Sequence, residues 1–199
     1  MATDALDEAY WQNRYENGTD GWDLGAPSTP LKTYIDQLAD KDLRILIPGC
    51  GKAYEGEYLH RNGFRNVWLM DLTGAPFEAL LQRCPSFPRS HLLVGDFFAH
   101  DGQYDRIIEQ TFFCALDRGL REAYARKMAA MLAPGGKLVG VLFDDPQPGK
   151  SPDEPPFGGN KQEYDMLFGS HFARVNIQPC SNSIPPRAGR EVWIDIAHQ

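Results

Sequence analysis

The chain has 199 residues, the size of one compact α/β domain with little room for a second. Its 20 basic residues against 27 acidic ones give a net charge of −7, which disfavours nucleic acid or an acidic membrane as the main partner. Residues 1–60 hold 5 basic and 11 acidic side chains, so this third alone has a net charge of −6. That acidity would suit a small cationic ligand, although a solvated polar face is the simpler explanation.

The remaining composition is that of a folded intracellular protein. Hydrophobic residues make up 42% and aromatic residues 12%, enough for an ordinary core. No apolar run approaches the roughly 20 residues of a membrane span, and the acidic N-terminus lacks the features of a signal peptide. The four cysteines lie far apart without metal-ligand spacing, so we expect reduced thiols, no metal site and a cytoplasmic location.

Short apolar runs alternate with helical segments along the chain. The predicted elements are strand 43–47, helix 53–62, strand 67–71, helix 75–83, strands 91–94 and 106–109, helix 117–132, strand 137–143, a helix to about 168 capped by Asn160, and strands 172–178 and 191–197. This order predicts an α/β fold: a mostly parallel sheet with helices on both faces, to which the last strands add an antiparallel strand. Residues 144–159 form a Pro/Gly-rich loop of a length that is usually functional or mobile.

Glycines and acids follow the first three strands, at the edge where such sheets bind ligands. Pro48-Gly49-Cys50-Gly51-Lys52 follows the first strand, but Tyr54 stands where a dinucleotide motif needs a third glycine. Asp71 ends the second strand and suits two ribose hydroxyls, while Asp96 and Phe97 after the third suit an adenine amino group and ring. With the Pro-Gly-Gly turn before the fifth strand, this set favours S-adenosylmethionine over a nicotinamide cofactor.

Three aromatic side chains, Trp11, Tyr15 and Trp22, lie among acids in the N-terminal segment. Aromatic faces attract a sulfonium by about 0.5–2 kcal/mol each, and an aromatic lid would exclude water from a reacting methyl group. On spacing alone, however, Trp11 and Tyr15 are more simply explained as docking a helix onto the core.

The segment Trp11–Asp23, together with Pro48-Gly-Cys-Gly51, resembles the thiopurine methyltransferase superfamily. Within it, the plant-type halide/thiol methyltransferases are the most similar branch, through Glu109–Leu116, Pro155-Pro156-Phe157, Tyr164 and Ser183–Arg187. The resemblance implies a Rossmann-like fold with a seven-stranded, mostly parallel sheet and a C-terminal antiparallel strand. It also implies a single class I S-adenosylmethionine-dependent methyltransferase domain over residues 1–199, whose residues 1–30 form an aromatic lid.

The resemblance also implies a set of cofactor-binding residues. These are Trp11, Tyr15 and Trp22 around the methionine portion, Gly49 and Gly51 in the glycine loop, Asp71 at the ribose, Asp96 and Phe97 at the adenine, and Gln110 after the fourth strand. Tyr15 stands where the plant-type enzymes have Trp, and Lys52 is as in the thiopurine branch. Gln110 replaces Tyr of the plant type and Arg of the thiopurine branch, a change on the acceptor side that concerns the substrate rather than the cofactor.

We expect methyl transfer to a small soft nucleophile: a thiol, hydrosulfide, thiocyanate or a halide. Such an acceptor needs no general base, so the protein aligns and desolvates it and we assign no catalytic residue. The alternatives are a larger thiopurine-like or oxygen or nitrogen acceptor, and a non-catalytic module that only binds S-adenosylmethionine. Arg187 could attract an anion or merely pair with Glu191 at the surface. We expect no partner beyond a small-molecule acceptor, in a monomer or dimer.

Overall fold

The structure, a computed structural model, describes residues 6–198 and is built on one seven-stranded sheet of order β3-β2-β1-β4-β5-β7-β6. The strands are β1 (Ile45–Pro48), β2 (Val67–Asp71), β3 (Leu92–Val94), β4 (Tyr104–Gln110), β5 (Leu132–Phe143), β6 (Arg174–Pro179) and β7 (Glu191–Ala197). The first five pair in parallel, and β7 runs antiparallel between β5 and β6. The predicted fold class is confirmed.

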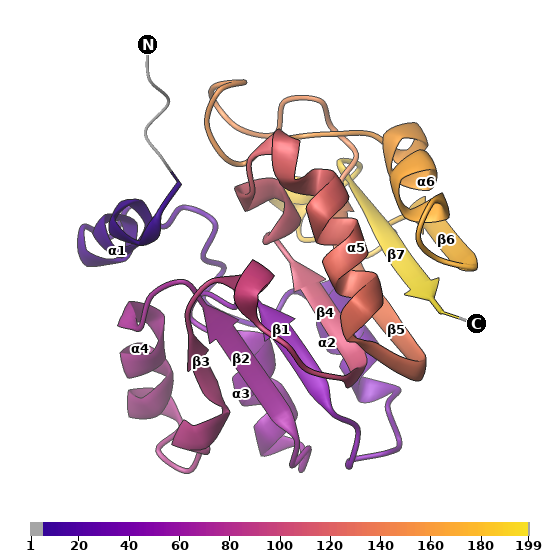
Figure 1. Cartoon of the computed structure of the whole chain (residues 1–199). Helices are drawn as coiled ribbons and strands as arrows, with labels where there is room; N and C mark the ends of the chain where they lie inside the picture. Colours follow the sequence, from indigo (N-terminus) through magenta and orange to yellow (C-terminus); the bar gives the residue numbers. More distant parts are fainter. Residues whose placement is uncertain (1–5, 199) are drawn as a thin grey trace.

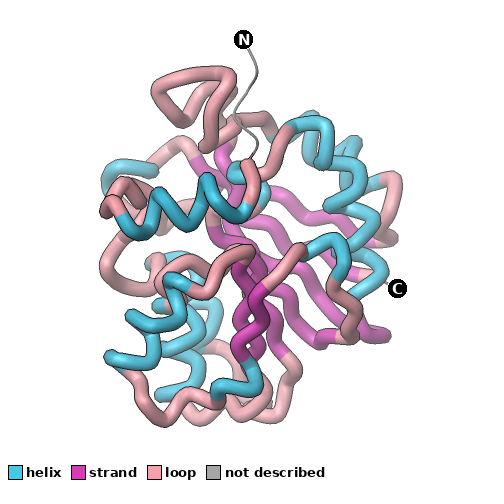
Figure 2. Tube along the Cα trace, turned by 60° about the vertical axis from the view of Figure 1, so that its left-hand side comes forward, coloured by secondary structure: helices cyan, strands magenta, loops and turns pink. Residues whose placement is uncertain are grey.

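Helices cover both faces of the sheet (Figure 2). They are α1 (Glu8–Glu16), α2 (Thr29–Asp36), α3 (Tyr54–Arg61), α4 (Ala75–Arg83), α5 (Arg121–Met131) and α6 (Lys161–Gly169). Alternation along β1 explains the two layers: Ile45 and Ile47 join the core cluster that contains α2, α3 and α4 residues, whereas Leu46 joins the cluster of α5 and α6. Both faces are apolar, as expected of a parallel sheet.

Several boundaries differ from the sequence prediction. Helix α5 begins at Arg121 rather than 117, because Asp117 caps a separate 3-10 turn by accepting the N–H of Gly119. Strand β5 already begins at Leu132, which pairs with Tyr104 ahead of a register shift. Helix α2 was not predicted. Asn160 does cap α6 by accepting the N–H of Glu163, as predicted.

Helix α1 lies over the carboxyl ends of the parallel strands, the edge of the sheet where a ligand was predicted (Figure 1). The long loop 144–159 is held at both ends, since Asp145 pairs with Gly159 and the N–H of Phe157 donates to Cys114 O at 2.6 Å. Among residues 6–198, no helix has the length and apolarity needed to cross a bilayer.

Candidate functional site

The loop after β1 has a backbone that only glycine adopts readily. Gly49 and Gly51 have φ of +55° and +52°, and Ala53 before α3 has +59°. A Cβ at Gly49 would lie 2.3 Å from Cδ2 of Phe112, so the loop packs closely on the turn after β4. A Cβ at Gly51 would instead lie 3.6 Å from Nε1 of Trp22. The loop therefore lies between the β4 turn and the N-terminal aromatic residues.

Asp71, at the end of β2, is the buried acid nearest this loop. Its Oδ2 accepts the N–H of Gly51 at 3.1 Å and the hydroxyl of Tyr15 at 3.2 Å, and its Oδ1 accepts the N–H of Thr73 at 3.3 Å. The side chain is buried, and burial raises its pKa while these donors oppose the rise. A carboxylate has about four lone-pair positions, so Asp71 keeps capacity for a ligand hydroxyl.

The three N-terminal aromatic residues form one group. Trp22 packs edge-on against Trp11 and Tyr15, with ring centroids 5.5 and 5.8 Å apart. Helix α1 contains no fully buried residue, so it does not dock as a core helix would. Its Tyr15 hydroxyl instead bonds Asp71, and the Gly51 Cβ position lies 3.7 Å from that hydroxyl. The sequence-predicted aromatic positions and the glycine loop are thus brought together.

An ion-pair cluster that was not assigned from the sequence ties this segment to the glycine loop. The Nζ of Lys52 lies 2.7 Å from Oδ2 of Asp20 and 2.6 Å from Oδ2 of Asp23. Hydrogen bonding to Lys52 and to the N–H of Gly25 lowers the pKa of Asp23 against the effect of burial. The excess of acidic residues among residues 1–60 was the sequence feature that pointed to this cluster. Lys52 neutralises part of that excess by pairing with Asp20 and Asp23.

A second unassigned group lies on the β4 side of the loop. Ser28, just before α2, donates its N–H to Oε1 of Glu55 at 2.8 Å and its hydroxyl to Oε1 of Gln110 at 3.1 Å. Glu55 is buried in the first turn of α3. A cleft between these elements is lined by Trp22, Asp23, Leu24, Ala26, Ile47, Gly49, Cys50, Gly51, Lys52, Tyr54, Glu55, Gln110 and Thr111. The sequence spacing of Ser28 and Glu55 does not identify them as residues of the site.

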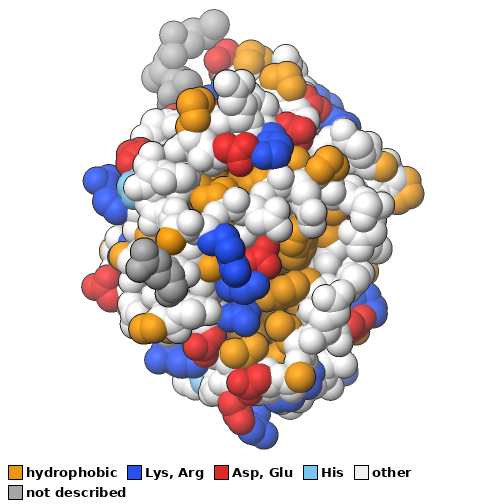
Figure 3. Space-filling view, turned by 90° about the vertical axis from the view of Figure 1, so that its right-hand side faces the viewer, with side chains coloured by type: hydrophobic (Ala, Val, Ile, Leu, Met, Phe, Trp, Pro, Cys, Tyr) orange, Lys and Arg blue, Asp and Glu red, His pale blue; other side chains and the backbone are white. Residues whose placement is uncertain are grey.

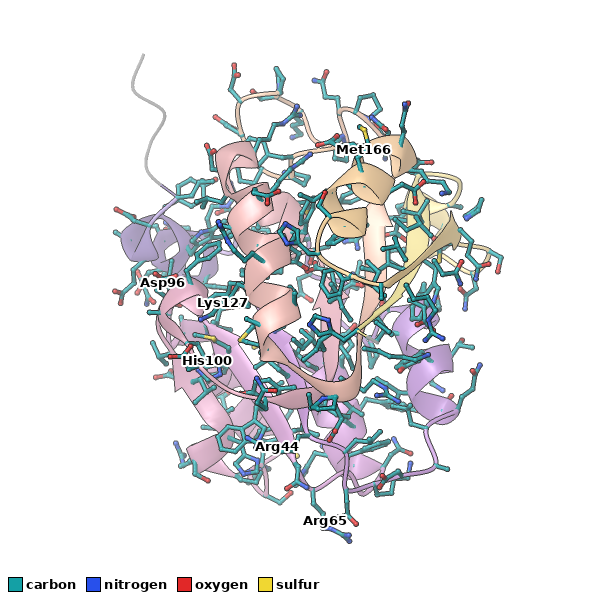
Figure 4. The ribbon with its side chains drawn as sticks, turned by 45° about the vertical axis from the view of Figure 1, so that its right-hand side comes forward. Arg44, Arg65, Asp96, His100, Lys127 and Met166 are labelled. Carbon is teal, nitrogen blue, oxygen red and sulfur yellow. The ribbon has the colours of Figure 1, made fainter. Side chains whose placement is uncertain are left out.

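The predicted adenine contacts lie at the end of β3. Asp96 is exposed and accepts the N–H of Phe98 at 2.8 Å (Figure 4). Phe97 is only 5% exposed, and its ring packs edge-on against Phe112 with centroids 5.0 Å apart. The adenine contact of these two residues stays a prediction, and Phe97 has little ring surface free to make it.

Titratable side chains near the cleft are engaged by their neighbours or favoured in the neutral form. Glu109 accepts the N–H groups of Phe112 and Phe113 on one oxygen and the Tyr124 hydroxyl on the other, and burial raises its pKa to about 7. Burial also raises the pKa of the Cys50 and Cys114 thiols, the latter to about 12, which disfavours the thiolates. That no residue acts covalently stays a prediction.

Arg187 is buried rather than exposed. Its Nη1 lies 3.5 Å from Oε1 of Glu191, and its Nη2 donates to the carbonyl of Trp22 at 3.2 Å. It therefore pairs with Glu191 and also holds the N-terminal segment, in a buried setting that the sequence did not indicate.

Comparisons with known proteins identify the family and the fold of this chain. The family model described as thiopurine S-methyltransferase matches residues 6–190. A crystal structure of Burkholderia thailandensis 1,6-didemethyltoxoflavin-N1-methyltransferase, with its namesake ligand and S-adenosylhomocysteine bound, has a TM-score of 0.75 at 20% identity and covers 98% of this chain and 88% of its own. That likeness shows the fold.

Relatives come from two branches. "Probable thiol methyltransferase 2" of Arabidopsis thaliana is 29% identical over 91% of this chain and 81% of its own length. "Thiocyanate methyltransferase 1" of Brassica oleracea is 27% identical over 94% and 84%, and the "Thiopurine S-methyltransferase" of Vibrio vulnificus 26% over 85% of each chain. The resemblance inferred from the sequence is confirmed at the level of the family: this chain belongs to the thiopurine S-methyltransferase family.

Proposed function

We propose that this protein transfers a methyl group from S-adenosylmethionine to a small soft nucleophile: a thiol, hydrosulfide, thiocyanate or a halide. The observation that carries the proposal is the junction of Asp71, Gly51 and Tyr15, in which a buried acceptor bonds both the glycine loop and the aromatic segment. When bound, the cofactor would supply an electrophilic methyl group on a sulfonium. Family membership and the relatives named for thiol and thiocyanate methylation support this reading.

The residues present fit that cofactor. Asp71 has acceptor capacity left for a ribose hydroxyl, and Gly51 leaves its Cβ position open, with the nearest atoms of Trp22 and Tyr15 at 3.6 and 3.7 Å. The Trp22 ring already has a cation over it, since Cζ of Arg14 lies 5.3 Å from the ring centroid. Residues 1–30 would then act as the lid, of which residues 1–5 lie outside the described residues.

The anchored loop 144–159 favours a small acceptor, because it closes the site near the turn after β4. Phe157 of the long loop is buried and its N–H bonds Cys114 O, while Arg121 Nη2 donates to Gly158 O at 2.7 Å. These anchors hold the loop against the turn after β4, and leave a small cavity lined by Glu109, Thr111, Cys114, Val141, Leu142, Phe143 and Glu191. A soft anion needs no proton removed, which fits the engaged carboxylate of Glu109.

The test is incubation with methyl-labelled S-adenosylmethionine and a panel of hydrosulfide, thiocyanate, iodide, an aromatic thiol and a thiopurine. We expect label in the volatile products of the small acceptors. Label only in the extractable thiopurine product would replace the small acceptor by a large one. Cofactor binding without any labelled product would indicate a non-catalytic binding module.

We further propose a cytoplasmic protein, monomeric or dimeric, whose partner is its small-molecule acceptor and not a polynucleotide or a membrane. In support, the face in Figure 3 carries both basic and acidic side chains, beside a band of apolar side chains at its centre. All four cysteines are free, as expected in a reducing compartment.

A further inference from the structure

Glu55 is a buried carboxylate for which neither the fold nor the proposed chemistry has yet given a role. It is 7% exposed and lies in the first turn of α3, directly after the glycine loop. Outside its own backbone, its hydrogen-bond donors come from Ser28, whose N–H is 2.8 Å from Oε1. The side chain lines the cleft beside Gly49 and Gln110.

Asp23, the other acid that lines the cleft, has a cation in contact, whereas Glu55 forms no ion pair with any described residue. Asp23 and the neighbouring Asp20 share Lys52 at 2.6 and 2.7 Å. Arg187 acts on Glu55 only weakly and from a distance, since its guanidinium pairs with Glu191 and bonds Trp22 O. Burying a carboxylate without a cation is costly, so this arrangement favours a positively charged ligand at Glu55.

The position of Glu55 in the cleft indicates which part of a bound ligand would contact it. The strand order β3-β2-β1-β4 places Asp71 on one side of the glycine loop and Gln110 on the other. Ser28 joins Glu55 to Gln110, so Glu55 belongs to the β4 side, away from Asp71. A ligand whose ribose is at Asp71 would therefore bring its opposite end toward Glu55.

We propose that Glu55 accepts the α-ammonium group of S-adenosylmethionine. This rests on the proposed cofactor and adds a residue that selects its amino-acid end. Ser28 is the positioning residue, because its N–H donates to Oε1 of Glu55 at 2.8 Å.

The test compares two ligands that differ only beyond the sulfur. S-Adenosylhomocysteine carries the amino-acid end, whereas 5′-methylthioadenosine keeps the adenosine and lacks it. In Glu55→Gln the amide oxygen can still accept the Ser28 N–H. We expect the calorimetric Kd of S-adenosylhomocysteine to rise at least about tenfold, in line with the loss of a charge-assisted hydrogen bond, and that of methylthioadenosine to stay within about twofold.

Glu57→Gln is the matched control, since Glu57 is on the same helix but binds Arg61 and Arg83. It should change neither Kd. An equal loss for both ligands in Glu55→Gln, or no loss, would overturn the proposal and leave Glu55 as an anchor for Ser28. If the wild type binds neither ligand, the proposed function fails and this inference with it; if it binds both, only the inference is at stake.

A ligand change keeps the test independent of folding. An S-adenosylhomocysteine analogue that lacks only the amino group should bind the wild type about tenfold more weakly than the parent compound. Equal affinity for the two would contradict the role of Glu55 without any substitution.

Discussion

The two sides of the glycine loop contain similar acids in different settings. Asp71 and Glu55 are both buried beside the glycine loop. Asp71 receives donors from three segments, namely Gly51, Thr73 and Tyr15, whereas the donors around Glu55 outside its own backbone come from Ser28. Burial alone therefore does not distinguish a structural acid from a ligand-binding one. Nor does the lack of an ion pair, which Asp71 and Glu55 share among the described residues; what differs between them is the set of donors that each carboxylate accepts.

The largest loss of unfolding free energy should come from substitutions in the glycine loop, which lies between Asp71 and Glu55. Gly49→Ala combines a strained φ of +55° with a Cβ 2.3 Å from Phe112, and should cost about 2–4 kcal/mol of unfolding free energy. Gly51→Ala has a similar φ but its Cβ position is open, so it should cost only about 1–2 kcal/mol. Denaturant titration measures both, and equal losses would contradict the packing of the loop on the β4 turn.

The second-largest effect is the pH dependence of the unfolding free energy that comes from Glu109, a buried acid in β4. The pKa of Glu109 is raised from 4.5 to about 7, so the folded state holds the proton more tightly than the unfolded state. The contribution of Glu109 to the free energy of unfolding should be fully present below pH 4.5 and should be lost as the pH rises to about 7, by up to roughly 3 kcal/mol. Glu109→Gln should flatten this slope. An unchanged slope would show that Glu109 is ionised throughout.

Tyr15→Phe tests the Asp71 side by removing only a hydroxyl. The hydrogen bond to Asp71 at 3.2 Å joins the N-terminal segment to the proposed ribose acceptor, so its loss should weaken S-adenosylhomocysteine binding by about 1 kcal/mol, or roughly fivefold. Unchanged or tighter binding would mean that the hydroxyl competes with the ligand instead of supporting it.

The smallest effect should follow from Lys52→Met. The ion pairs with Asp20 and Asp23 are partly exposed, so their loss should cost about 1 kcal/mol or less. The difference in melting temperature between wild type and variant should shrink as salt is raised from about 0.05 to 0.5 M, because salt screens exposed pairs. A difference that does not respond to salt would indicate packing of the lysine stem.

The sequence predicted the sheet well because apolar runs ending in glycine or aspartate identify parallel strands. β2 and β7 match their predicted bounds residue for residue. Helix α2 was missed because it is short and begins at a Thr-Pro pair within a polar stretch. The Asp71 side could be assigned because an acid at the end of the second strand is a positional signal. The Glu55 side could not, because the contact with Ser28 joins residues 27 positions apart through the fold alone.

The most direct test of the account is a calorimetric titration of S-adenosylhomocysteine into the wild type and Asp71→Ala. Asp71 is a buried acceptor beside Gly51, so its removal should cost about 1–3 kcal/mol of binding, a rise in Kd of roughly 5- to 150-fold from a single site in the wild type. Equal affinity in the two proteins, or no binding by the wild type, would contradict the placement of the cofactor at this cleft.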